Sequence, residues 1–175
     1  MRVAFVNRTR RAVDAPRSRR FLRAVASSVD APDGTLTVLF CGDAEMAELN
    51  GAWRGKPHPT DVLSFEGYAG TAAGAAHVGD LAISLETAAR QARRAGRSLG
   101  SEIEMLLTHG VLHLMGYDHE TDDGTMMRLQ ARTLAAVRPR GRRRPGGREP
   151  AAAGPRRRSA VRTTRAGNSP RGAGR

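Results

Sequence analysis

The net charge of this chain is concentrated in its last 38 residues, and this confines the fold to the remainder. Residues 138–175 carry 13 arginines, one acid and one large aliphatic residue, whereas residues 1–137 carry 16 basic and 16 acidic residues. A segment with so few apolar side chains buries too little surface to offset the entropy of ordering. We therefore predict one folded domain over residues 1–137 and a disordered, Arg/Gly/Pro-rich basic tail over residues 138–175.

Apolar periodicity in the first 137 residues predicts four strands and five helices. The expected strands are 3–6, 36–41, 62–65 and 78–84, and the expected helices are 16–29, 43–49, 85–95, about 98–115 and about 122–137. We expect the segment 51–61 to be a loop, because it is rich in Gly and Pro. This order predicts an α+β fold in which about five helices pack on a small mixed four-stranded sheet, with residues 62–84 forming an antiparallel pair.

Cysteine and apolar content indicate the compartment. Cys41 is the only cysteine and follows an apolar run, so no intrachain disulfide can form and a reducing environment is expected. No stretch approaches the roughly 18 apolar residues of a membrane span. We expect a soluble cytoplasmic protein that does not bind membranes.

Three of the five histidines lie within eleven residues, in the sequence HGVLHLMGYDH. His109 and His113 are four residues apart, so they share one face of a predicted helix. Gly116 permits the chain to reverse after the helix, which returns His119 toward the other two. One histidine on so apolar a helix is usually a hydrogen-bonded core residue, but three are satisfied together by a metal ion. Three imidazoles and one open position are typical of catalytic zinc.

The same spacing occurs in metzincin proteases, whose motif is H-E-x-x-H-x-x-G-x-x-H. Here Gly110 stands where those enzymes carry the glutamate that activates water. A metzincin-like zinc protease is therefore an alternative. It would use the same metal site, but the sequence lacks the proton acceptor of those enzymes.

Three blocks of the sequence resemble the YbeY family of rRNA maturation factors. These blocks are HGVLHLMGYDH, LNGAWRGKPHPTDVLSF and VGDLAIS, and the resemblance covers roughly residues 1–137. It implies a single-strand-specific endoribonuclease that acts in 16S rRNA 3′-end maturation and ribosome quality control. It also implies one Zn²⁺ per chain on His109, His113 and His119, and a functional role for Arg54. The implied partners are single-stranded rRNA, the small ribosomal subunit and ribosome-associated proteins.

Other residues suggest how such a site would work. A guanidinium is always charged and matches a phosphate with two parallel hydrogen bonds, so we expect Arg54, in the 51–61 loop, to bind a phosphate. Asp80 and Asp118 are candidates to orient a ligand imidazole. The nucleophile would be zinc-activated water or the RNA 2′-hydroxyl, and the sequence does not choose between them. A non-catalytic ribosome-assembly factor, in which zinc only stabilises the fold, is a further alternative.

A formally neutral domain needs local basic patches to attract RNA. The candidates on the two helices concerned are Arg17, Arg19, Arg20, Arg23, Arg90, Arg93, Arg94 and Arg97. The basic tail is a further candidate, because an arginine-rich arm binds phosphates without sequence preference and in a salt-dependent way.

Overall fold

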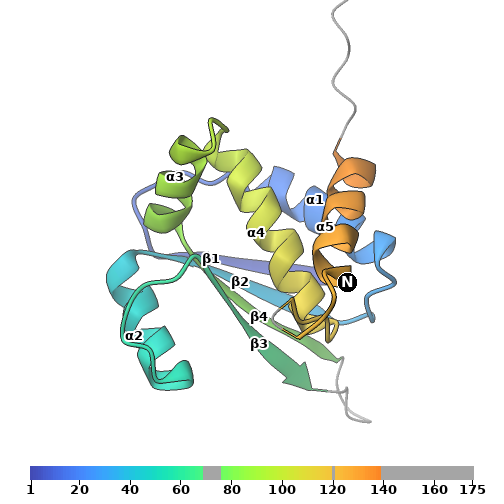
Figure 1. The fold of residues 1–175 in the computed structure, drawn as a ribbon, viewed down its shortest axis with the longest axis horizontal. Helices are drawn as coiled ribbons and strands as arrows, with labels where there is room; N and C mark the ends of the chain where they lie inside the picture. The colour runs from blue at the N-terminus through green and yellow to red at the C-terminus, as the bar shows by residue number, and fades with distance from the viewer. Residues whose placement is uncertain (69–75, 120, 139–175) are drawn as a thin grey trace, which may run out of the picture. The chain divides into compact units, whose positions relative to one another are not determined.

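The computed structural model describes residues 1–68, 76–119 and 121–138 (Figure 1). The strands are β1 (Arg2–Asn7), β2 (Thr35–Cys41), β3 (Val62–Tyr68) and β4 (His77–Ser84). The helices are α1 (Ala15–Ser28), α2 (Asp43–Arg54), α3 (Leu85–Arg94), α4 (Leu99–Leu114) and α5 (Thr125–Val137). The predicted order of elements is confirmed. The basic tail lies outside the described residues except for Arg138, so its disorder stays a prediction.

The four strands form one mixed sheet in the order β1-β2-β4-β3. The strands β1, β2 and β4 run parallel, and β3 pairs antiparallel with β4, so that Ser64 lies opposite Leu81. The predicted antiparallel pair is therefore confirmed. Because β3 pairs only with β4, it is the edge strand at one side of the sheet.

The two faces of the sheet are covered by different helices (Figure 1). On one face, the apolar side chains of β2 and β4 pack with α1 and α4, around Leu22, Leu107 and Val111. On the other face, Leu63 of β3 packs with Met46 of α2 in a smaller cluster. Successive residues of a strand point to opposite faces, so α4, which contacts Ser64, and α2 lie on opposite sides of the sheet.

Helix α2 is longer than predicted and carries Arg54 as its last residue. The prediction that the helix ends near Leu49 and that Arg54 lies in a loop is wrong. The physical reason is Gly55, whose left-handed conformation (φ +68°) places the helix end after Arg54 and whose N–H donates to Gly51 O. Within the described ranges, no helix has the length and apolar character that crossing a bilayer requires.

Candidate metal centre

The C-terminal end of α4 has the geometry that the sequence predicts. Gly116 adopts φ +83°, its N–H donates to His113 O at 2.9 Å, and the N–H of Tyr117 donates to Leu112 O at 3.1 Å. This pair of bonds is the Schellman motif, which ends a helix and reverses the chain. The turn that follows carries His119 back toward the helix.

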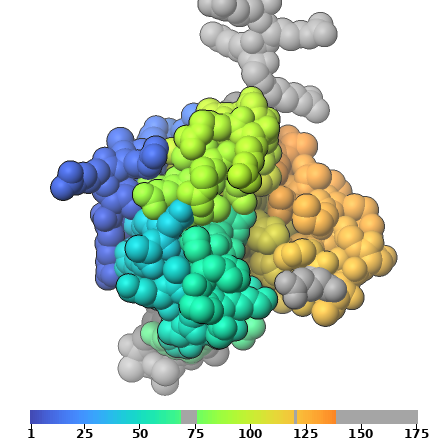
Figure 2. Space-filling model, turned by 60° about the vertical axis from the view of Figure 1, so that its left-hand side comes forward, coloured from blue at the N-terminus to red at the C-terminus, as the bar shows by residue number. Residues whose placement is uncertain are grey.

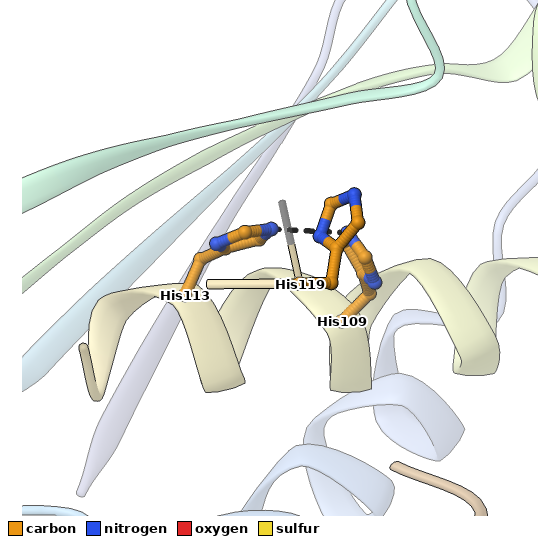
Figure 3. A group of neighbouring side chains, drawn as sticks. All are labelled: His109, His113 and His119. Carbon is orange, nitrogen blue, oxygen red and sulfur yellow. Dashed lines mark hydrogen bonds between the residues drawn. The ribbon is translucent and has the colours of Figure 1, made fainter. Parts of the chain in front are cut away.

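The three predicted ligands come together in the folded chain (Figure 3). One ring nitrogen from each of His109, His113 and His119 lies within 4.8 Å of the other two. The Nε2 atoms of His109 and His113 are 3.1 Å apart. Two rings are partly buried and His119 is exposed, so the cluster opens to solvent on one side.

Gln130 of α5 orients His109, and the sequence analysis did not identify it. Its Oε1 atom lies 2.9 Å from His109 Nδ1 and only accepts hydrogen bonds, so Nδ1 carries the proton. The lone pair of that ring is thereby placed on Nε2, which faces the cluster. The available signal was the position of Gln130, four residues after the buried Met126, because a polar residue in a buried helical stripe needs a partner.

Burial lowers the pKa of His113 below its ordinary value, and the nearby His109 and His119 lower it further. A neutral imidazole offers its lone pair to a metal, whereas an imidazolium does not. The site therefore favours the state of His113 that a metal needs.

These residues fit a zinc ion or a similar transition metal. Two nitrogens on one zinc ion at bonds of about 2.0–2.1 Å are roughly 3.3 Å apart in a tetrahedral arrangement, close to the separation of the His109 and His113 nitrogens. Within the described residues, this is the one group of three or more potential ligand side chains. The donor set is three imidazoles, which suits zinc, copper, iron or nickel better than magnesium or calcium.

Gly110 is required by the packing of α4 on the sheet. A Cβ atom at this position would lie 2.6 Å from Leu81 Cδ2 and 3.3 Å from Ser64 Oγ. Leu81 is buried in the core, so a glutamate here would displace well-packed atoms. A metzincin glutamate at this position would therefore require the buried Leu81 side chain to move, which weakens the protease alternative.

The other predicted site residues, Arg54, Asp80 and Asp118, differ in what they contact. Arg54 has an exposed side chain on α2, and no hydrogen bond or ion pair joins it to the histidines in the described part of the chain. Asp80 lies 2.9 Å from His77 Nε2 and so orients a histidine outside the cluster. Asp118 lies close enough to His113 to raise its pKa, against the larger lowering by burial, and accepts a hydrogen bond from Thr121.

Half of the arginines proposed as RNA-binding patches have partners within the protein. Arg17 pairs with Glu104 at 2.7 Å, Arg90 with Asp43 at 2.6 Å, and Arg97 with the buried Glu102. Arg19 donates to Val3 O and lies over the ring of Phe5. The remaining candidates have exposed side chains: Arg20, Arg23, Arg93 and Arg94.

Comparison with known proteins places the chain in a family. Residues 6–138 match the family described as Endoribonuclease YbeY. The protein named Endoribonuclease YbeY from Jannaschia sp. (strain CCS1) is 46% identical over an alignment of length 122, and the match covers 63% of this chain and 76% of that protein. The protein of the same name from Geobacter metallireducens is 39% identical over an alignment of length 137, and the match covers 75% of this chain and 91% of that protein.

A solved structure shares the fold. It is the solution structure of TM1509 from Thermotoga maritima, which is 23% identical, covers 77% of this chain and 88% of that one, and gives a TM-score of 0.51. At this identity, the likeness extends to the arrangement of helices and strands alone. The family match covers most of the domain. The chain that carries the histidine cluster at the end of α4 is therefore a member of the YbeY family.

Proposed function

We propose that this chain is a zinc-dependent endoribonuclease that cleaves single-stranded rRNA. The observation that carries the proposal is the histidine cluster, in which three ring nitrogens lie within 4.8 Å of one another. Membership of a family described as Endoribonuclease YbeY supplies the substrate class. The proposed biological role is maturation of the 16S rRNA 3′ end and ribosome quality control.

The protein residues would divide the work as follows. His109, His113 and His119 hold one ion, and Gln130 keeps the proton of His109 on Nδ1, away from the ion. Zn²⁺ bound there would supply a Lewis acid beside the scissile phosphate and make a bound water more acidic. Arg54 binds a phosphate with its guanidinium, whose positive charge offsets the charge that develops on the non-bridging oxygens.

The nucleophile is either water or the RNA 2′-hydroxyl. Gly110 supplies no base at the position that metzincins use. Both routes break the same phosphodiester bond, and they differ in the ends produced. Attack by the 2′-hydroxyl leaves a cyclic phosphate, whereas attack by water leaves a linear phosphate monoester, so the product ends distinguish them.

The proposed partners are the small ribosomal subunit and ribosome-associated proteins, in the cytoplasm. Four arginines with exposed side chains on α1 and α3 remain as candidates for attraction to RNA, and the tail adds 13 arginines. Binding through such contacts weakens steeply as salt rises, because each neutralised phosphate releases counterions.

Cleavage of a single-stranded fragment from the 3′ end of precursor 16S rRNA tests the proposal. The protein loaded with one equivalent of Zn²⁺ should cut the fragment, a chelator should stop the reaction, and added Zn²⁺ should restore it. Arg54→Ala should reduce the rate about 100-fold or more without changing the zinc content or melting temperature. Arg132→Ala, which removes an exposed arginine from α5, is the matched control and should cleave normally.

Three outcomes would contradict the proposal. In the first, the zinc-loaded protein is inert on every such RNA and His113→Ala behaves identically, which would rule out the endoribonuclease activity. Chelator-sensitive peptide hydrolysis without RNA cleavage would favour the protease. Normal rRNA processing by a folded, zinc-free His113→Ala variant would favour a non-catalytic assembly factor.

A further inference from the structure

Trp53 is an unusually exposed aromatic residue near the end of α2. Its relative exposure is 70%, the highest among the exposed large hydrophobic residues of the described chain, and it is the only tryptophan in the sequence. An exposed side chain of this size and apolar character forgoes the stabilisation that its burial would contribute. Such a residue is therefore a candidate for contact with a ligand.

One side of the Trp53 ring is supported by Phe65 of β3. The two ring centroids are 5.4 Å apart with an interplanar angle of 68°, which is an edge-to-face contact. Phe65 itself packs against the apolar cluster of Leu63 and Met46. The indole is thereby anchored on the protein and still exposes most of its surface to solvent.

Two basic residues lie close to Trp53 in the sequence. Arg54 follows Trp53 directly and Lys56, the only lysine of the chain, lies two residues further on. Both side chains are exposed, and neither forms an ion pair with a residue in the described ranges. They are thus available to a negatively charged ligand.

The backbone that carries these cations is fixed by Asn50, which is 2% exposed. Asn50 O accepts from the N–H of Lys56 at 3.2 Å, and its side-chain amide donates to His58 O at 2.8 Å. A ligand at this position therefore meets a preorganised segment, so less entropy is lost on binding.

The edge strand β3 lies between this ring and the histidine cluster. Phe65 contacts Trp53, and its neighbour Ser64 donates to the carbonyl of Gly110, the residue after His109, at 3.4 Å. Although α2 and α4 lie on opposite sides of the sheet, the cyan and teal atoms of α2 and β3 and the yellow atoms of α4 are all visible on the side of the molecule that Figure 2 shows. A strand of RNA that crosses the edge of β3 would reach both places.

We propose that Trp53 is a stacking platform for an unpaired nucleobase of the substrate, with Arg54 and Lys56 on the adjoining phosphates. The inference rests on the proposed function. An exposed aromatic surface, with two exposed cations within three residues of it in the sequence, suits the alternation of base and phosphate in a single strand. Every base has a π-face but a duplex base is already stacked, so the platform favours single strands with little regard for sequence.

The fluorescence of Trp53 tests this directly, because no other tryptophan contributes. The probes are a 12-nucleotide oligouridine RNA with a fluorescent label and the same oligonucleotide with abasic sites, whose phosphates are identical. Using the zinc-loaded full chain, we expect oligouridine to quench Trp53 and the abasic version to bind without quenching. Trp53→Ala should weaken oligouridine binding roughly tenfold or more, Trp53→Phe should restore most of it, and neither should alter zinc content.

Tyr68→Ala removes another exposed aromatic of β3 and is the control, with affinity expected to be unchanged. Anisotropy of the label measures binding of oligouridine. If oligouridine binds without changing Trp53 emission, and Trp53→Ala binds it with unchanged affinity, the stacking role of Trp53 is overturned and the proposed function is not. Failure of the chain to bind either oligonucleotide would overturn the proposed function together with it.

Discussion

Two polar clusters of this protein differ in the kinds of groups that they bring together. In the Asp43 cluster, formed by Asp43, Ser84, Thr87 and Arg90, the carboxylate accepts hydrogen bonds of 2.5 to 2.8 Å from the three other residues. In the histidine cluster, three rings direct nitrogen atoms at one another, the Nε2 atoms of His109 and His113 lie at hydrogen-bond distance, and Gln130 holds His109 from outside.

This difference distinguishes a cluster that stabilises the fold from a cluster that is suited to binding a ligand. The Asp43 cluster joins the first turn of α2 to α3, and it pairs the Asp43 carboxylate with the positive charge of Arg90 at 2.6 Å. Burial raises the pKa of Asp43, but the hydrogen bonds from Arg90, Ser84 and Thr87 outweigh it and hold the pKa at about 2. The histidine cluster brings one nitrogen from each of three rings within 4.8 Å of the others, and a cation from outside would complete this donor set.

Removing one metal ligand should have the largest effect on this comparison. His113→Ala leaves two ligands, and we expect the metal content to fall from one ion per chain to nearly none and RNA cleavage to stop. Elemental mass spectrometry of the purified protein measures the first. His58→Ala, in the exposed segment after α2, is the control that should keep its metal. Full metal retention in His113→Ala would assign the ion to other residues.

Loss of the Gln130 acceptor should have an intermediate effect. Gln130→Met keeps the approximate volume but frees the His109 proton to occupy either nitrogen, so zinc affinity should fall about 10- to 100-fold. Competition with a chromogenic chelator measures it. Gln130→Glu retains an acceptor and should bind zinc at least as tightly as the wild type. Equal affinities in all three proteins would show that Gln130 does not orient the ligand.

Disrupting the Asp43 cluster should lower stability and leave metal binding intact. Because the pKa of Asp43 falls from 3.8 to about 2 on folding, its charge stabilises the fold by about 2 kcal/mol above pH 4. This contribution is lost as the pH falls through the folded pKa. Urea unfolding of Asp43→Asn at pH 7 measures the loss, which should shrink toward pH 2. Weakened zinc binding would contradict the separation of the two clusters.

The smallest expected effect is an acid destabilisation that depends on His113. Its pKa is lowered by folding, so below about pH 6.5 the unfolded chain binds more protons and the metal-free protein loses stability. The thermal midpoint of the metal-free protein should therefore decline between pH 7 and pH 5. In His113→Leu this decline should be shallower, and an identical slope would remove His113 as its cause.

Local patterns predicted the elements and the grouping of the three histidines, because both depend on residues close in sequence. The helical spacing of His109 and His113, and the reversal at Gly116, needed no tertiary information. The end of α2 was mistaken because a segment rich in Gly and Pro does not show which glycine ends the helix, and here it is Gly55.

Contacts between distant segments could not be predicted in the same way. Arg90 appeared to be a surface charge for RNA, but its carboxylate partner lies 47 residues earlier in the chain. Gln130 is 21 residues from the histidine that it orients, and helical periodicity does not pair a side chain on α5 with one on α4.

The three predicted ligands lie close together in the sequence, and this affects how much a bound metal would stabilise the fold. All of them lie between His109 and His119, so the unfolded chain keeps them within a short, flexible stretch and can also capture zinc. A ligand raises the free energy of unfolding only to the extent that it prefers the folded chain. The gain in melting temperature should therefore be smaller than the zinc affinity of the native protein suggests, and the Gln130 contact is part of that preference.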